Sequence, residues 1–378
     1  MTPSLLKKWS FENAPIAPNG AGVYALAIMR YFFYCSLAAL LFAGAAVRTR
    51  AAESPNDTGI TSIVIRFLDT FKPEERKKIQ FDFDDAERKD WSNLPTRNVP
   101  RKGIPLAEMS RPSQLAAHEL MRASLSSQGY LKAAAVVHRD EVLVRVGGSS
   151  ATFGAGKYYF GVFGNPAADK RWGWQFDGHH LALNFTYVDG ELTGAPALWG
   201  AQPDQIEVGD EAGWRVFAAE RAKGYAVVHS LTAQQKTTAI LSDKLPASIF
   251  TGPQRDKALQ KFEGLPASSM TPAQQALLWT LIDEYVNNQT EKVARAHRAK
   301  IEKEGFGKVH FAWMGSTDPA KSCYFRVHGP SILIEYDNTG ATRTERDSNH
   351  IHSMFRDPSN DYGEDLLKKH YQSAAHAR

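Results

Sequence analysis

Cysteine is scarce in this sequence, with two residues in 378. Cys35 lies in an apolar N-terminal run, so Cys323 is the single thiol of the remaining chain. This shortage excludes an intramolecular disulfide framework and a cluster of thiolate metal ligands. We interpret Cys323 as a small apolar strand residue and not as a nucleophile.

Several catalytic signatures are also missing. The glycine-rich segment 147–157 resembles a phosphate-binding loop only loosely, and it runs into a predicted strand where such a loop should open a helix. The sequence has no nucleophile elbow and no Cys-x-x-Cys pair. Histidines and carboxylates therefore remain as the groups from which a site would be built.

An excess of charge of one sign is missing once the N-terminal segment is set apart. Residues 1–52 hold five of the 45 basic residues and one of the 41 acidic residues, which leaves 40 of each. A chain near neutrality lacks the clustered Lys and Arg that give nucleic-acid binding its non-specific affinity. We therefore expect no nucleic-acid partner.

The N-terminal segment is typical of an export signal. An apolar run over 31–47 follows Arg30 and precedes small residues at which a signal peptidase could cut. The stretch before Met29 is long for a basic n-region, whereas a start at Met29 gives ordinary proportions. Within the leader 1–51 we therefore expect that residues 1–28 are not translated and that 29–51 is the signal peptide. The mature protein would be periplasmic or secreted, without membrane contact. The alternative is an uncleaved membrane anchor. The run is slightly short for a full span unless residues 23–29 join it, which would place Arg30 in hydrocarbon at a cost of about 2.5–3.5 kcal/mol.

Apolar patterning predicts an α+β fold in a single large domain over 58–371, with an antiparallel sheet core and helices packed on it. Helical spacing is found over 58–71, 110–129 and 271–305. Alternation with a period of two is found between 141 and 199, beginning at 141–146, and again over 309–314, 323–327 and 332–336. The segment 215–239 has a mixed pattern, and Asp361 with Glu364 matches a capping box that opens a last short helix.

Residues typical of metal and acid–base sites gather in the segment 331–371. His350 and His352 are two apart, so on an extended segment both imidazoles lie on one side, within reach of one ion. The alternative is one buried, hydrogen-bonded histidine beside one surface histidine. Zinc, copper, iron and manganese would all suit imidazole and carboxylate ligands.

A second polar group lies in the predicted strand that contains His179 and His180. On a strand, His179 shares a face with Leu181 and His180 shares the other face with Asn184. The two histidines therefore cannot face one site unless Gly178 introduces a bulge. We predict His180 as a third metal ligand and His179 as a residue packed against apolar neighbours.

The carboxylates near these histidines permit two interpretations. Glu335 and Asp337 share a strand face and could serve as metal ligand and general base, or form salt bridges with arginines. Arg356 and Asp357 could hold an imidazole in one tautomer. Without a metal, His352 and Asp357 could form an acid–base couple.

A non-catalytic function is the alternative to a metal site. Four aromatic residues of the predicted sheet could line a groove for a small-molecule ligand, with the histidines serving structure: Tyr158, Trp172, Trp174 and Trp199.

Several motifs occur in a fixed order along the chain: LSSQGY (125–130), WGWQFDGHHLALNFT (172–186), GAPALWGAQP (194–203), FAWMG (311–315), GPSILIEYDNT (329–339) and HIHSMFRDPSNDYGEDLLKKHY (350–371). In this set the chain resembles the bacterial family catalogued as domain of unknown function 3500. The resemblance covers about 58–371 and implies an exported, single-domain protein without a settled activity. The resemblance places the family's His-His strand on His179 and His180 and its His-x-His motif on His350 and His352. It places the family's Arg-Asp pair on Arg356 and Asp357, and its Asp-Tyr-Gly motif on Asp361, Tyr362 and Gly363.

Overall fold

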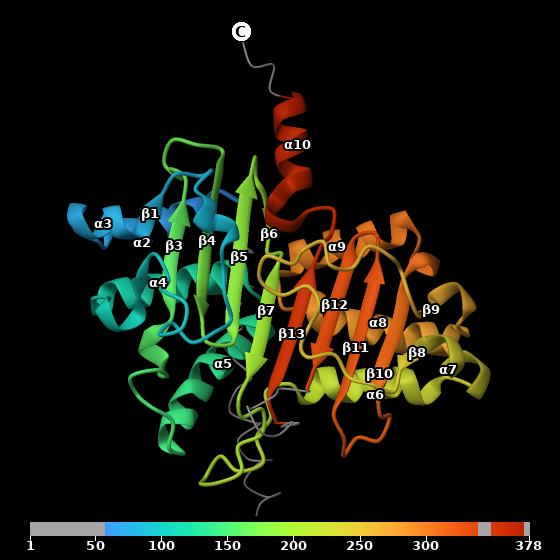
Figure 1. Ribbon diagram of the computed structural model, residues 1–378. Helices are drawn as coiled ribbons and strands as arrows, with labels where there is room; N and C mark the ends of the chain where they lie inside the picture. The colour runs from blue at the N-terminus through green and yellow to red at the C-terminus, as the bar shows by residue number, and fades with distance from the viewer. Residues whose placement is uncertain (1–56, 339–348, 374–378) are drawn as a thin grey trace, which may run out of the picture. The chain divides into compact units, whose positions relative to one another are not determined.

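A computed structural model describes residues 57–338 and 349–373 (Figure 1). The predicted leader 1–51, with its signal peptide, lies outside the described residues. Among the described helices, none has the length and apolar character that a membrane span requires.

The α-helices are α2 (Asp57–Asp69), α3 (Pro73–Ile79), α4 (Arg111–Ser124), α5 (Ser127–Arg145), α6 (Ala218–Ser230), α7 (Ala233–Ala239), α8 (Pro272–Val286), α9 (Glu291–Glu304) and α10 (Glu364–Ser373). The strands are β1 (Gln80–Phe81), β2 (Ile104–Pro105), β3 (Tyr159–Phe163), β4 (Arg171–Gly178), β5 (Leu181–Val188), β6 (Glu191–Thr193), β7 (Ala197–Ala201), β8 (Ile240–Ser242), β9 (Leu265–Pro266), β10 (His310–Gly315), β11 (Cys323–Gly329), β12 (Ile332–Asp337) and β13 (Ile351–Arg356).

The described strands form one 13-stranded sheet with the main order β1-β3-β4-β5-β7-β13-β12-β11-β10-β8. Most neighbouring strands are antiparallel, and the parallel pairs β1–β3 and β8–β10 lie at the two edges. The predicted α+β class and the largely antiparallel sheet are confirmed.

The strands follow one another in the same pattern when the sheet is followed inward from either edge. From one edge it runs β1-β3-β4-β5-β7 and from the other β8-β10-β11-β12-β13, and the two sets meet where β7 pairs with β13. The helices follow the same scheme, since α2 to α5 alternate with the first set as α6 to α9 do with the second. The described chain therefore contains two structural repeats, which we define as 57–201 and 218–356.

Short sequence matches accompany the repeat. Gly103 and Gly264 both have positive φ, 97° and 103°, and a side chain at either would collide with a backbone carbonyl of the adjacent strand. Gln114 and Gln275 each donate hydrogen bonds to two backbone carbonyls of the preceding turn. These positions satisfy the same local requirements of the backbone in both repeats.

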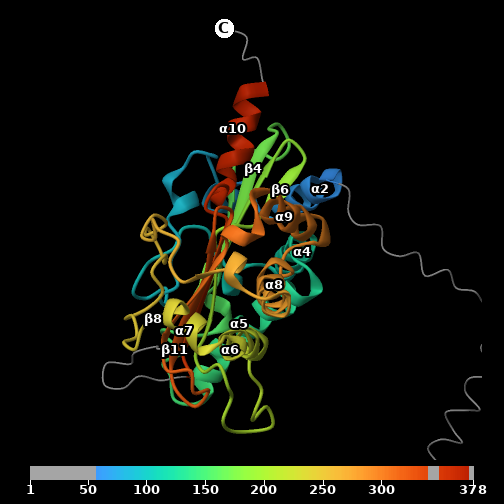
Figure 2. The ribbon, with the colours of Figure 1, turned by 90° about the vertical axis from the view of Figure 1, so that its right-hand side faces the viewer.

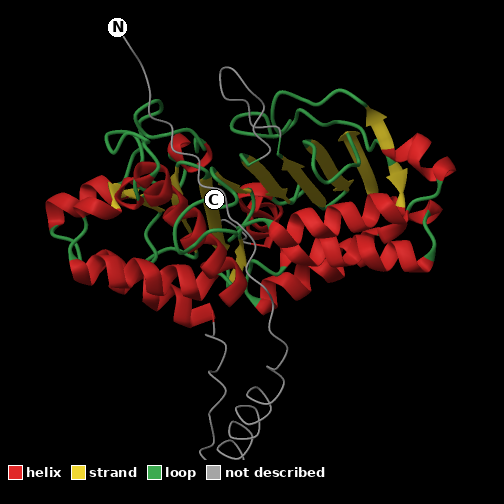
Figure 3. Ribbon diagram, turned by 90° about the horizontal axis from the view of Figure 1, so that it is seen from below, coloured by secondary structure: helices red, strands yellow, loops and turns green. Residues whose placement is uncertain are grey.

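The two faces of the sheet have different coverings. Figure 2 shows α2, α4, α5, α6, α8 and α9 on one face, which we call the helix face. Figure 3 shows mainly loops on the other face, the loop face. The main hydrophobic core fills the helix face, where Trp174, Phe325 and Leu281 are buried. A small second core lies on the loop face and includes Trp91, Leu198 and Met354.

Three predicted elements are wrong in their type or extent. The segment 141–146, predicted as a strand, is the end of α5, which begins after the Ser126 cap and continues to Arg145, with Val146 as its C-cap. Gly129, predicted as a helix end, lies inside α5, where any side chain would collide with the Asn288 carbonyl. The segment 271–305 is not one helix but α8 and α9, separated by a linker in which Gln289 forms a β-bridge with Leu125.

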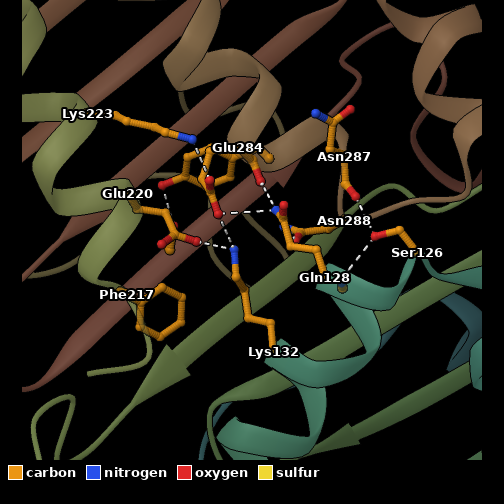
Figure 4. A network of polar contacts seen from close by, with 12 residues as sticks. Ser126, Gln128, Lys132, Phe217, Glu220, Lys223, Glu284, Asn287 and Asn288 are labelled. Carbon is orange, nitrogen blue, oxygen red and sulfur yellow. Dashed lines mark hydrogen bonds and ion pairs between the residues drawn. The ribbon is translucent and has the colours of Figure 1, made fainter. Parts of the chain in front are cut away.

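A buried charge network links helices of the two repeats (Figure 4). Lys132 of α5 contacts the carboxylates of Glu220 and Glu284, and its distance to Glu284 Oε1 is 2.9 Å. Lys223 of α6 pairs with the other Glu284 oxygen at 2.6 Å. Gln128 adds hydrogen bonds to the Glu284 carboxylate and backbone. Two lysines and two glutamates thus balance one another inside the helix layer.

Candidate metal centre

His179 and His180 form the two-residue turn between β4 and β5. The turn is closed by the pairing of Gly178 with Leu181. His180 has a φ of 65°, a left-handed conformation that is uncommon for a residue with a side chain. A side chain at Gly178 would overlap the Tyr158 ring, which explains the glycine before the turn. The strand-face argument for the two histidines is therefore wrong, because both lie in the turn and not in a strand.

His352 on β13 is connected to this turn through its neighbour on β7. Its neighbours across β13 are Gly200 on β7 and Asp337 on β12, and the Gly200 amide donates a 2.6 Å hydrogen bond to the His180 carbonyl. A Cβ atom at Gly200 would lie 3.2 Å from Cβ and from Cδ2 of His180. The missing side chain thus leaves the space in which the His180 ring lies beside His352. His350, two residues earlier, shares the side of His352.

The structure brings the three predicted ligand residues together. The ligand nitrogens of His180, His350 and His352 all lie within 4.8 Å of one another, and the Nε2 atoms of His180 and His350 are 2.8 Å apart. Ring centroids are separated by 4.7 Å for His180 and His350, 5.1 Å for His180 and His352, and 4.7 Å for His350 and His352. Three imidazoles at such distances fit a divalent transition metal, which binds histidine nitrogens at about 2.0–2.1 Å.

The surroundings favour the neutral form of these imidazoles. Burial lowers the pKa of His180 well below its usual value, and the nearby histidines add to the effect. Burial likewise lowers the pKa of His352 to about 3, again with a contribution from His350 and His179. Neutral imidazole is the form that coordinates metals, so no proton has to be displaced from these two rings at neutral pH.

His179 lies against the cluster without belonging to the three. Its Nδ1 is 2.7 Å from the Asp140 carboxylate, and its ring stacks on the His180 ring at 3.8 Å. Phe153 is the apolar neighbour that the sequence leads one to expect, with ring centroids 4.9 Å apart. Sequence reasoning missed Asp140, because it ended the helix at Gly129 and left Asp140 in the connection before a predicted strand.

Glu335 is engaged away from the histidines. Its carboxylate accepts hydrogen bonds from the amides of Phe250 (2.6 Å) and Thr251 (2.8 Å), from the Thr251 hydroxyl and from the Tyr324 hydroxyl (2.8 Å). Glu335 thereby fixes the loop that also brings Ser248 Oγ to 3.4 Å from His352 Nδ1. Of the two predicted carboxylates, the buried Asp337 is the one placed next to His352.

Arg356 and Asp357 lie at the other end of β13. Asp357 accepts hydrogen bonds from Lys300 (2.8 Å) and from the Ser359 hydroxyl (2.9 Å). Asp357 is five positions further along the chain than His352, which is about 17 Å in an extended strand. The predicted acid–base couple of His352 and Asp357 is therefore wrong, and so is the expectation that this pair orients an imidazole of the site.

The remaining charged groups of this region serve structure. Arg356 donates to the Thr251 carbonyl at 2.8 Å and to the Asp361 carboxylate at 2.6 Å. Asn360, and not Asp361, accepts from the amides that open α10, at 3.0 and 3.3 Å. The predicted capping box is wrong because the buried arginine engages the Asp361 carboxylate.

The aromatic residues predicted to line a groove are part of the core. Tyr158, Trp172, Trp174 and Trp199 are at most 3% exposed. Trp174, for example, stacks on Phe185 at 4.6 Å within the helix-face core. A small-ligand groove built from these four residues is therefore excluded.

Comparison with known proteins gives one match. The model of the family described as "Protein of unknown function (DUF3500)" matches residues 53–364, most of the chain. No curated protein and no solved structure matches.

Proposed function

This chain belongs to the DUF3500 family, and we propose that it is a metal-binding protein in which His180, His350 and His352 hold a divalent transition metal. The observation that carries the proposal is the approach of three ligand nitrogens to within 4.8 Å of one another. His180 and His350 are 170 positions apart in the sequence, so the fold and not closeness along the chain brings their rings together.

The reaction that we propose for the metal is hydrolysis. Catalytic zinc sites commonly use three protein ligands, and a bound ion would supply Lewis-acid activation of water or of a substrate carbonyl. The imidazoles would hold the ion. Asp337, opposite His352 in the sheet, is the carboxylate that we assign as ligand or general base. We also propose export to the periplasm or beyond, which the apolar run after Arg30 supports.

Elemental analysis tests the metal. The full chain is purified from an exporting host without chelator and without a histidine tag, beside a His350→Ala/His352→Ala variant and a His229→Ala/His310→Ala control. In the control, the two replaced rings lie next to backbone carbonyls outside the cluster, of Thr317 and Lys308. We expect near-stoichiometric metal in the parent and the control, and none in the folded site variant.

A parent that holds no metal, even after incubation with zinc, copper and manganese, would contradict the proposal. If metal is found, assays with chromogenic ester, amide and phosphoester substrates test hydrolysis. We expect turnover that depends on the metal and disappears in the site variant and in Asp337→Asn.

A further inference from the structure

We propose that His179, held by Asp140, is a positioning residue that sets the orientation of the His180 imidazole for metal binding. The inference rests on the proposed metal site and assigns a role to two residues outside its ligand set. His179 acts on the metal only through the ring that it stacks on.

His179 is held from several directions. Its Nδ1 lies 2.7 Å from Asp140 Oδ1, and both side chains are buried, at 7% and 3% exposure. The Tyr158 hydroxyl donates a 2.6 Å hydrogen bond to the His179 carbonyl, which fixes the backbone of the turn. Phe153 packs on the His179 ring. The ring therefore has one orientation, anchored to helix α5 by Asp140.

The fixed ring lies directly on the first ligand. The centroids of His179 and His180 are 3.8 Å apart, with an angle of 29° between the ring planes. This stacking restricts rotation of the His180 side chain. The restricted ring places its Nε2 2.8 Å from Nε2 of His350. The order of contacts runs from Asp140 through His179 to His180 and the ligand cluster.

The fold does not by itself require this arrangement. The equivalent turn of the second repeat, between β11 and β12, is formed by Pro330 and Ser331 after Gly329. A buried carboxylate beside a buried imidazole has a desolvation cost that a Pro-Ser turn avoids. The extra cost in the first repeat is explained if the pair orders a metal ligand.

The expected size follows from the ordering of one side chain. Fixing a side chain of several rotamers has an entropic cost, and groups that orient metal ligands change metal affinity by about 10- to 100-fold. Without Asp140, the metal would have to order both rings when it binds. Metal affinity should therefore fall while the three ligands remain present.

Binding of Co²⁺ tests this role, because its visible spectrum reports coordination geometry. We measure the dissociation constant by competition with a chromophoric chelator, together with the spectrum, for the parent, Asp140→Ala and Asp140→Asn. We expect Asp140→Ala to bind about 10- to 100-fold more weakly with an altered spectrum. Asn still offers an oxygen to the Nδ1 proton, so Asp140→Asn should recover most of the affinity and the parent spectrum.

Glu141→Ala is the matched control. Glu141 is the next residue of α5, and its carboxylate accepts a 2.6 Å hydrogen bond from the Ala155 amide, close to the 3.4 Å bond from the Gly154 amide to Asp140. The Glu141→Ala variant controls for loosening of this loop, and its affinity for Co²⁺ should equal that of the parent. A parent-like Asp140→Ala, or an equal loss in Glu141→Ala, overturns the positioning role alone. A parent that binds no Co²⁺ overturns the metal site and this role together.

Discussion

Two hairpin turns occupy equivalent places in the two repeats, and they are built differently. His179 and His180 join β4 to β5, whereas Pro330 and Ser331 join β11 to β12. His180 has positive φ, and Ser331 is not among the described non-glycine residues with positive φ. The same hairpin thus forms without strain and without imidazoles. The hairpin does not require a strained turn that buries two histidines, and this difference supports the proposed metal site.

The partners of the turn differ in the same way. Ala182 pairs with Leu198 in the first repeat as Leu333 pairs with Arg356 in the second. By this register, His350 and His352 correspond to Leu192 and Gly194, which are not metal ligands. All three histidine ligands therefore lie at one end of the sheet, and the equivalent positions of the other repeat hold no histidine.

The largest expected effect concerns Glu335, whose equivalent in the first repeat is Asn184. Glu335→Ala leaves several buried donors of the loop and Tyr324 without a partner, at about 1–3 kcal/mol each. We expect urea unfolding of the metal-free variant to show a loss of about 3 kcal/mol or more, with metal affinity retained. Asn184→Ala is the control and should lose less, since Asn184 makes two side-chain hydrogen bonds. Unchanged stability with lost metal binding would instead make Glu335 a ligand.

The next effect separates function from folding at the strained turn. His180→Asn removes a ligand, and we expect metal affinity to fall by about 100-fold or more. Asn tolerates left-handed φ better than most residues, so the free energy of unfolding of the metal-free protein should stay within about 1 kcal/mol. Titration with a chelator and urea unfolding check the two quantities. A large loss of stability would mean that the fold does need this histidine.

The smallest net effect in the parent is a pH dependence in which two contributions oppose each other, from the residues before the two turn glycines, Asp177 and His328. Burial raises the pKa of Asp177 to about 7, so the folded state retains its proton and stability falls as the pH rises from about 4 to 7. Burial lowers the pKa of His328 to about 4, so the unfolded state binds the proton there and stability rises with pH up to about 6.5. The two contributions have opposite signs over the same window and largely cancel.

His328→Gln exposes the contribution of Asp177. Urea unfolding of the variant is compared with that of the parent between pH 4.5 and 6.5. Relative to the parent, the variant should lose stability as the pH rises, at up to about 1.4 kcal/mol per unit, because the opposing contribution of His328 is absent. If the stability of the variant and the parent depended on pH in the same way, the predicted pKa shift of His328 would be contradicted.

Local patterns predicted much of the fold. The C-terminal strands β10, β11 and β12 and the helix α2 lie within a few residues of their predicted positions, because periodic burial and turn residues specify them locally. The helix break before α9 was not predicted, since it depends on Leu125, a residue of the other repeat. The repeat left a signal in the sequence, because the segments that begin at Gly103 and Gly264 are similar. These segments are short, and the remaining sequences of the two repeats have diverged.

The site was predictable in composition and only partly in geometry. The spacing of His350 and His352 predicted that their rings lie close together, and the ring centroids are 4.7 Å apart. That His180 joins them depends on Gly200, which makes room for its ring, and on the β7–β13 pairing across the repeats. The roles of Glu335 and Asp357 could not be read locally, because their hydrogen-bond partners, Thr251 and Lys300, are 84 and 57 residues away in sequence.

The most direct measurement is an anomalous difference map from crystals of the protein grown or soaked with Zn²⁺ and recorded on both sides of the zinc absorption edge. We predict one strong peak bonded to His180, His350 and His352, with nitrogen distances of about 2.0–2.1 Å. A map with no peak at the three histidines, or with zinc only at other side chains, would contradict the assignment of this turn as a metal centre.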